Sequence, residues 1–197
     1  MERSNPYLLV FARVVIGFCL YPFYHLQIRG RENLPQDKAF ILLPKHQRWE
    51  DIPLLGLATP NTLYYVAKHE LFLNPVNKWL ISALGGIPLN RKRPIESRRA
   101  LKQMIAVLKY GEGLAIFPEG TYYNGHMGPG RVGLIRMVSS RLALPFIPVG
   151  IRYPKGGIRA RVQINFGTPI YNDTSVAADT FVQRVMQEIA KLSGLSL

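Results

Sequence analysis

The sequence predicts an α/β fold in which helices flank a mainly parallel sheet. Short apolar runs that suit buried strands alternate along the chain with stretches that carry apolar residues at helical spacing. Such alternation is typical of parallel sheets, because the connection between two parallel strands usually contains a helix that covers one sheet face. The chain has 197 residues and no internal repeat or linker, which is the length of one domain.

The pattern of apolar residues predicts each element in turn. Strands are expected at 24–30, 39–44, 62–67, 113–118, 144–151 and 159–167. Helices are expected at 51–58, 74–84, 94–111 and 176–194. Open α/β sheets form their sites at the carboxyl ends of strands, so the polar residues that follow 39–43 and 113–117 are expected to carry the chemistry.

Residues 6–26 form an apolar segment long enough to raise the question of a membrane. Arg13 interrupts this segment and Pro22 ends it, whereas a spanning helix needs about 20 apolar residues and disfavours an arginine near the bilayer centre. The small-residue cleavage site of a secretory signal is not evident. We therefore expect a helix that lies in the membrane interface, with a helix packed on the protein's own core as the alternative. The chain then divides into a membrane-associating helix at 1–24 and one domain at 25–197.

The composition favours an anionic partner. The formal charge is +13 and the isoelectric point is about 10.1, which suits nucleic acid, an anionic membrane surface or a phosphorylated ligand. No basic stripe interleaved with stacking aromatic residues is present, so nucleic acid is not the expected partner. Cys19 is the only cysteine, which excludes an internal disulfide and a zinc site built from thiolates, and a reducing compartment is the simplest assumption.

His46 and Asp51 stand where the apolar run 39–43 gives way to polar residues. Residues five apart do not share a helix face, but a loop that leads into a helix can bring them together. Asp51 would then orient the imidazole and stabilise its protonated form, and His46 would act as a general base toward a hydroxyl group. The alternative is a loop histidine followed by a helix N-cap at Asp51.

Three further segments strengthen the catalytic interpretation. Residues 117–121 read FPEGT, in which Gly120 lets the backbone approach a ligand closely. Residues 85–91 read GGIPLNR and end at Arg91, and residues 145–150 form the apolar run PFIPVG. No serine or cysteine stands in the setting of an activated nucleophile.

In this order the segments resemble the glycerolipid acyltransferase family, of which 1-acylglycerol-3-phosphate acyltransferase is the typical member. The resemblance extends from about residue 30 to residue 170 and rests on the His-x4-Asp block, the glycine-to-arginine block, the FPEGT block and the proline-containing strand. It implies an acyltransferase domain at 25–197 that moves an acyl chain from coenzyme A or acyl carrier protein to the hydroxyl of a lysophospholipid. It also implies a peripheral or monotopic place on the cytoplasmic face of a membrane, and direct transfer without an acyl-enzyme.

The resemblance also implies roles for single residues. His46 would be the base and Asp51 its orienter, and Arg91 would hold the phosphate of the acceptor. Glu119, Gly120 and Thr121 would shape the acceptor and acyl-carbonyl site. The implied reaction needs no metal or cofactor besides the thioester co-substrate. A catalytically silent lipid-binding or membrane-binding module on the same scaffold is the alternative.

The chain departs from the family's usual pattern at three places. Lys45 precedes His46 where a small polar residue is usual, and such a cation would either lower the pKa of His46 or meet a phosphate. Tyr122 and Tyr123 follow FPEGT in place of arginine and serine, which removes one expected phosphate ligand. Further along the chain a basic residue usually precedes a nearby glycine, and Arg131 with Gly133 is a plausible substitute.

The other three histidines are best explained as structural or surface residues. They are His25, His69 and His126. No spacing typical of metal ligands is present in the sequence.

Overall fold

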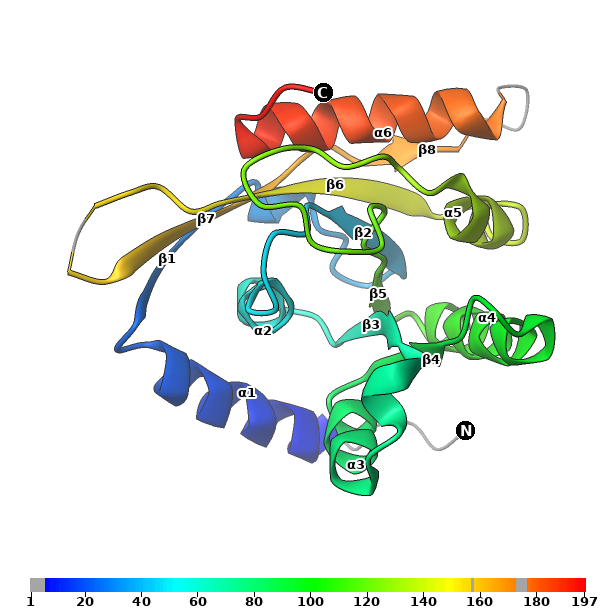
Figure 1. Cartoon of the computed structure of the whole chain (residues 1–197), viewed down its shortest axis with the longest axis horizontal. Coiled ribbons are helices and arrows are strands. Elements are labelled where there is room, and N and C mark those ends of the chain that lie inside the picture. The colour runs from blue at the N-terminus through cyan, green and yellow to red at the C-terminus, as the bar shows by residue number, and fades with distance from the viewer. Residues whose placement is uncertain (1–5, 157, 173–176) are drawn as a thin grey trace.

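One eight-stranded sheet forms the centre of the molecule (Figure 1). The computed structural model describes residues 6–156, 158–172 and 177–197. Along the sheet the strands follow the order β1-β7-β6-β2-β5-β3-β4, and β8 pairs with β6. The strands are β1 (Tyr24–Arg29), β2 (Phe40–Pro44), β3 (Leu63–Lys68), β4 (Gly86–Leu89), β5 (Gly113–Ala115), β6 (Pro145–Arg152), β7 (Ala160–Phe166) and β8 (Ile170–Tyr171).

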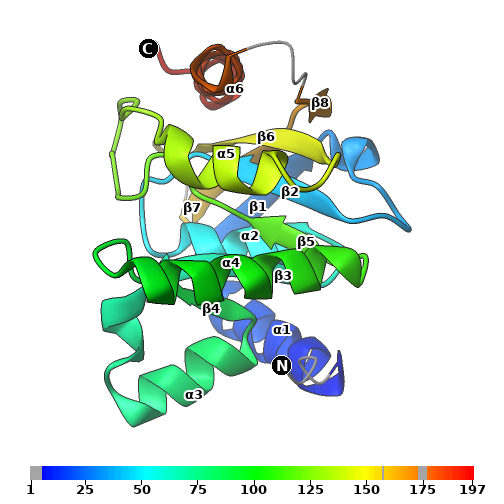
Figure 2. The same ribbon diagram turned by 90° about the vertical axis from the view of Figure 1, so that its right-hand side faces the viewer.

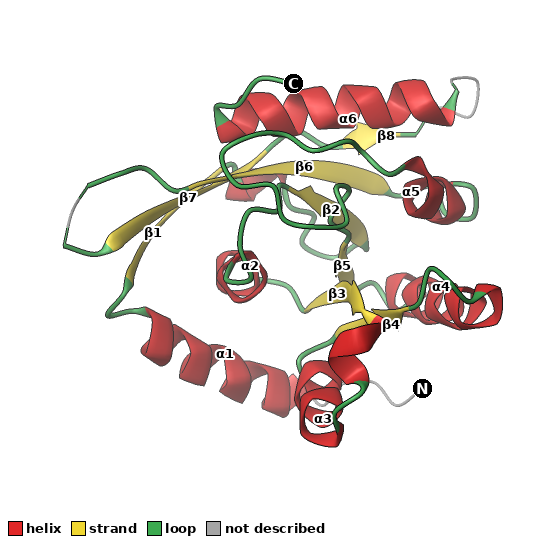
Figure 3. Cartoon of the chain, viewed as in Figure 1, coloured by secondary structure: helices red, strands yellow, loops and turns green. Residues whose placement is uncertain are grey.

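Helices cover both faces of this sheet (Figure 3). The α-helices are α1 (Pro6–Leu20), α2 (Asp51–Ala58), α3 (Pro75–Ala83), α4 (Pro94–Lys109), α5 (Val132–Ser139) and α6 (Ala178–Ser193). Two short 3₁₀ helices are η1 (Arg31–Asn33) and η2 (His69–Phe72). One apolar core lies between the sheet and α4, α5 and α6, and a second lies on the face covered by α2. Figure 2 shows α4 and α5 side by side over the strands, with α6 beside β6.

The central strand β2 explains why the fold is layered. All five of its residues are buried. Ile41 and Leu43 belong to the core under α4 and α6, while Phe40 and Leu42 belong to the core on the α2 side. Successive side chains of a strand point to opposite faces, so a strand covered on both faces has a continuous apolar sequence.

The predicted fold class is confirmed as a mainly parallel sheet flanked by helices. β2 runs parallel to both β5 and β6, and β3 runs parallel to β4 and β5. The helix expected at 51–58 has those bounds. β4, β8 and α5 were not predicted, and strands of four and two residues are too short for a clear period. Val176, the first residue of the helix expected at 176–194, lies outside the described residues.

The pairing of β7 places the first residues of β1 and β7 near the site. β7 runs antiparallel to β6 and parallel to β1. The first residues of β1 and β7 therefore lie toward the same edge of the sheet as the carboxyl ends of β2 and β6. This edge is where the polar residues predicted to carry chemistry gather.

The apolar N-terminal segment forms α1, which contacts the protein through one side only. Arg13 donates to the backbone carbonyl oxygens of Thr59 and Pro60 at the end of α2, so its charge is turned to the protein. The side chains of Phe11 and Phe18 are 65% and 83% exposed. None of the described helices has the length and apolar character required to cross a membrane. The division of the chain at residue 24 stays a prediction.

Candidate active site

Two loops meet at the carboxyl ends of β2 and β5. Because these strands are neighbours, the loop that begins at Lys45 lies beside the loop that begins after Phe117. The backbone N–H of Tyr123 donates to the carbonyl oxygen of His46 at 2.9 Å and joins the two loops. The sheet therefore brings together two sequence motifs that lie about 70 residues apart, as the rule for open α/β sheets predicts.

His46 and Asp51 form a buried pair. The distance from His46 Nδ1 to Asp51 Oδ2 is 3.1 Å, and the Asp51 side chain is fully buried. A carboxylate only accepts hydrogen bonds, so Nδ1 carries the proton and Nε2 is left with its lone pair. Nε2 has no hydrogen-bond partner among the described residues. This is the arrangement in which a histidine can take a proton from a substrate.

Asp51 does not cap the helix that it begins. Its Oδ2 accepts from the backbone N–H groups of Gln47 at 2.6 Å and Arg48 at 2.7 Å, which precede the helix. An N-cap side chain would instead accept from residues further along the helix. The capping alternative is therefore wrong, because the carboxylate turns back and holds the loop that carries His46.

Tyr153 is a further partner of Asp51. Tyr153 directly follows β6, and its hydroxyl donates to Asp51 Oδ1 at a distance of 2.5 Å. Burial and the neighbouring Asp51 carboxylate raise the pKa of Tyr153 above its ordinary value, so the hydroxyl keeps its proton. Asp51 thus receives donors on both oxygens, which fixes its direction toward His46.

The imidazole of His46 is held between two aromatic rings beside a cavity. The ring centroids of Phe117 and Tyr122 lie 3.9 Å and 4.4 Å from that of His46. The adjoining cavity has a volume of about 230 Å³. Its polar lining includes His46, Arg91, Thr121 and Tyr122, and its apolar walls include Ile52, Val66, Leu71, Leu89, Ile116 and Leu134. Such walls suit a hydrocarbon chain.

Arg91 and Arg131 lie on either side of Gly120. A Cβ atom at Gly120 would stand 2.5 Å from Nη1 of Arg91 and 3.0 Å from Cδ of Arg131, and the backbone there has φ +68°. Only glycine fits this place without strain. Burial and the neighbouring charge of Arg131 lower the pKa of Arg91. Among the described residues neither arginine has a carboxylate partner, and two adjacent unpaired guanidinium groups favour an anion.

The structure corrects the expectations for Glu119 and Lys45. Glu119 does not line the cavity, because its carboxylate is fully buried and accepts from Lys45 Nζ, the backbone N–H of His46 and the backbone N–H of Gly128. Lys45 does not reach a phosphate site either, since its buried ammonium lies 2.8 Å from Glu119 Oε1. Glu119 shapes the site by holding backbone, and Lys45 neutralises Glu119.

Gly120 and Thr121 line the cavity, and their role in shaping the acceptor site stays a prediction. Arg131 comes close to the site through its Nε, which donates to the carbonyl oxygen of Glu119 at 3.2 Å. Gln47 and Tyr153 were not predicted. Gln47 donates to the carbonyl oxygen of Ile151 and accepts from the N–H of Gly125, so it ties both loops to β6.

Comparison with known proteins decides the family. The sequence model of the family described as Acyltransferase matches residues 25–152, which is more than half of the chain. The chain belongs to this acyltransferase family. The match contains His46, Asp51, Arg91 and the turn at 117–121, and so includes each of the sequence blocks described above.

Relatives of this chain include enzymes of plants and bacteria. It is 30% identical to the chloroplastic 1-acyl-sn-glycerol-3-phosphate acyltransferase BAT2 of Brassica napus, over 76% of this chain and 46% of that protein. It is 33% identical to the 1-acyl-sn-glycerol-3-phosphate acyltransferase of Streptococcus pneumoniae, over 80% of this chain and 61% of that protein. The matched part is therefore about half of the length of these relatives.

The fold of this chain is also found in a crystal structure. The 1-acyl-sn-glycerophosphate acyltransferase PlsC from Thermotoga maritima superposes with a TM-score of 0.68 at 24% identity. The superposition covers 97% of this chain and 80% of that chain. The likeness extends over nearly the whole chain and establishes the architecture.

Proposed function

We propose that this acyltransferase moves an acyl chain from acyl-coenzyme A or acyl carrier protein to the hydroxyl of a lysophospholipid such as 1-acylglycerol-3-phosphate, in phospholipid biosynthesis. The observation that carries this proposal is the His46 imidazole, which is oriented by buried Asp51 beside a cavity with apolar walls. The names of the two relatives support the choice of acceptor.

The chemistry requires a base and no covalent intermediate on the protein. Nε2 of His46 takes the proton of the acceptor hydroxyl as the oxygen attacks the thioester carbonyl carbon. The tetrahedral intermediate then collapses, the C–S bond breaks, and the thiolate receives the proton from the imidazolium. Asp51 stabilises the imidazolium through Nδ1. The products are an ester and a free thiol, and His46 returns to its starting state.

The paired arginines support an acceptor with a phosphate group. Arg91 lines the cavity that contains His46, and Arg131 lies across Gly120 from it. Guanidinium groups bind phosphate oxygens through charge-assisted hydrogen bonds. Arg91 makes the contact, and Arg131 adds positive charge beside it.

Membrane association is part of the same proposal. α1 and α3 lie at the end of the molecule that is opposite α6 (Figures 1 and 2). On α1, Phe11 and Phe18 are exposed, and on α3, Val76 and Trp79 are 69% and 67% exposed. Exposed aromatic and aliphatic side chains together with a net positive charge suit the cytoplasmic face of a bilayer. η2 packs on α3 and contributes Leu71 to the cavity wall, so the cavity lies near this end.

An acyl-transfer assay tests the function. Purified protein is incubated with radiolabelled acyl-coenzyme A or acyl carrier protein and a panel of detergent-dispersed acceptors that includes lysophosphatidic acid and monoacylglycerol. We expect transfer to lysophosphatidic acid, and a loss of about 10²–10⁴-fold in His46→Ala. The exposed His126→Ala is the matched control and should keep its rate. A folded protein that binds lysophosphatidic acid but transfers nothing to any acceptor would instead be a silent lipid-binding module.

A further inference from the structure

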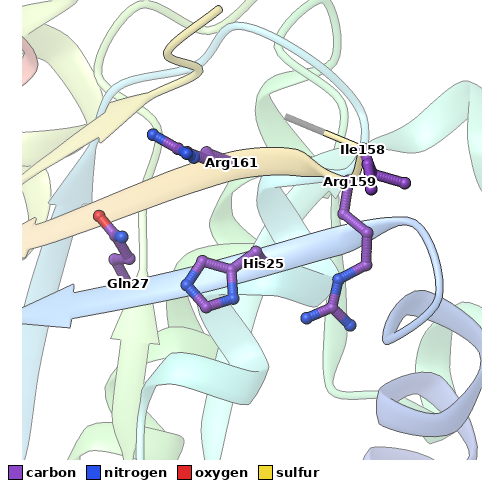
Figure 4. A pocket seen from close by; sticks show the side chains of 5 residues that line it. All are labelled: His25, Gln27, Ile158, Arg159 and Arg161. Carbon is purple, nitrogen blue, oxygen red and sulfur yellow. The ribbon is translucent and has the colours of Figure 1, made fainter. Parts of the chain in front are cut away.

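A second cavity lies on the outer face of the β1–β7 pair (Figure 4). Its volume is about 450 Å³, and its lining consists of His25, Gln27, Ile158, Arg159 and Arg161. It shares no lining residue with the cavity beside His46. The mechanism proposed above uses none of these side chains.

The register of the two strands explains why these residues share one face. His25 is paired with Arg161, and Gln27 with Gln163. Paired residues of neighbouring strands point to the same side, so Arg161 lies on the side of His25, and Arg159, which precedes β7, lines the same cavity. The other side of the strands packs in the core through residues such as Leu26 and Val162. The basic face is therefore built into the pairing of the sheet.

This face has positive groups and no negative ones. No Asp or Glu is found in the cavity lining within the described part of the chain. In that same part Arg161 and His25 have neither a hydrogen bond nor an ion pair through their side chains. Arg159 is held in place, because its Nη1 donates to the carbonyl oxygen of Tyr21 at 2.8 Å and its guanidinium lies 4.6 Å from the centre of the Tyr21 ring. One fixed arginine, one unpaired arginine and an imidazole are donors suited to a phosphate group.

Exposed apolar side chains border the same cavity. Ile158, which lines the cavity, is 107% exposed. Tyr21 and Phe23, which lie in the segment between α1 and β1, are 70% and 65% exposed. Apolar side chains beside arginines are typical of a surface that enters the headgroup region of a bilayer. The apolar side chains then reach the edge of the acyl-chain layer, and the arginines lie at the level of the phosphates. The end of α1, whose exposed side is described above, leads directly into this surface.

The position relative to the catalytic loop separates this surface from the substrate site. Tyr24, the neighbour of His25, points to the opposite side of β1, and its hydroxyl donates to Glu50 Oε1 at 3.1 Å. Glu50 precedes Asp51 in the catalytic loop. A ligand held by His25 and Arg161 thus lies across the strand pair from the acceptor.

We propose that His25, Arg159 and Arg161 form a binding site for the phosphate of an anionic phospholipid in the bilayer surface, separate from the acceptor site. This inference rests on the membrane association proposed above. The bound lipid acts as an anchor for the start of β1 and the end of α1, and it is not a substrate.

Vesicle co-sedimentation of the full chain tests the site. Vesicles of phosphatidylcholine with and without phosphatidic acid are compared for the wild-type protein and for Arg161→Gln. Arg184→Gln is the matched control, because Arg184 is an exposed arginine on α6 and its loss changes the net charge equally. We expect Arg161→Gln to bind phosphatidic acid vesicles about fivefold more weakly than the control, the ratio that corresponds to about 1 kcal/mol for one basic residue at the surface.

Three results would overturn the proposal. The first is an equal loss of vesicle binding in Arg161→Gln and Arg184→Gln, which would indicate attraction by the net charge of the protein and no specific site. The second is wild-type binding that does not depend on phosphatidic acid. The third is binding of inorganic phosphate that depends on Arg161, measured by calorimetry, with no effect of Arg161→Gln on vesicle binding. Acyl transfer to a detergent-dispersed acceptor is measured in every variant. Arg161→Gln should keep that rate, so failure of the lipid site is distinguishable from failure of the acyltransferase function.

Discussion

The ammonium of Lys45 lies 2.8 Å from Oε1 and 2.9 Å from Oε2 of Glu119, and neither side chain is exposed to solvent. Oε2 of Glu119 also accepts from the backbone N–H of His46 at 2.9 Å. The pair therefore connects the residue before His46 with the FPEGT turn. Lys45 compensates the charge of a carboxylate whose other contacts position His46.

Lys45→Met should destabilise the protein and slow transfer. Removing one partner of a buried ion pair leaves the other charge unpaired, which costs about 3–5 kcal/mol of unfolding free energy. The double variant Lys45→Met with Glu119→Gln should lose less than the sum of the two single losses, since neither charge is left alone. Urea unfolding of the four proteins measures this coupling. Strictly additive losses would show that the pair is not coupled.

Lys102→Met on α4 is the control for Lys45→Met, because Lys102 is exposed and the same atoms are removed. It should change the unfolding free energy by about 0.5 kcal/mol or less. The activity of Lys45→Met is compared with the wild type well below the unfolding transition, and Lys45→Arg is expected to recover part of it. A wild-type kcat in Lys45→Met would show that Lys45 has no part in positioning His46.

Asp51→Asn should lower kcat by about 10²–10⁴-fold. The amide keeps the shape of the carboxylate, but it does not stabilise the imidazolium and its NH₂ group favours the wrong tautomer of His46. The initial rate of acyl transfer and the urea midpoint are measured together. Asp179→Asn, at the exposed first turn of α6, is the control and should transfer at the wild-type rate. Normal turnover by folded Asp51→Asn would leave Asp51 with a purely structural role.

Tyr153→Phe should reveal a pH-dependent part of the stability. At neutral pH the loss of the hydroxyl removes a hydrogen bond to a charged group, worth about 1.5–3 kcal/mol. The pKa of Tyr153 is raised in the folded state, so the folded protein keeps this proton when the unfolded chain releases it. The contribution is complete below pH 10, the ordinary pKa of tyrosine, and is lost as the pH rises above it. The difference in unfolding free energy between wild type and Tyr153→Phe should therefore shrink as the pH rises above about 10.

The other tyrosines are common to both proteins, so their contributions cancel in the difference. A difference in unfolding free energy that stays constant across this range contradicts the assignment of Tyr153 as the donor to Asp51.

Arg91→Ala should raise the KM for lysophosphatidic acid more than the KM for monoacylglycerol. A charge-assisted hydrogen bond is worth about 1.5–3 kcal/mol, which corresponds to about 10–150-fold. Arg184→Ala should raise neither KM. Equal increases for both acceptors would move Arg91 from phosphate binding to support of the cavity wall.

The order of the elements was predictable because the signal for each is local. Strand β2 and helix α2 follow from a continuous apolar run and from apolar spacing, and both were expected within one residue of their bounds. The place of the site followed from the topology, since parallel strands bring their carboxyl ends to one edge. The pair of His46 and Asp51 was expected because a loop that leads into a helix can bring the two together and because of the resemblance to the acyltransferase family. The capping alternative at Asp51 could not be rejected without the direction of its side chain.

By itself, the sequence determined the fold class, the residues of the proposed catalytic pair and the glycine at 120, because apolar periodicity and short motifs are properties of neighbouring residues. Only the tertiary structure decided what Lys45, Glu119 and Tyr153 do, because their partners come from other strands and loops. Lys45 and Glu119 are 74 residues apart, and Tyr153 and Asp51 are 102 apart. The sequence does not tell whether a charged residue faces a substrate or a buried counter-ion. Packing decides this, because it removes Lys45 and Glu119 from water and leaves each as the partner of the other.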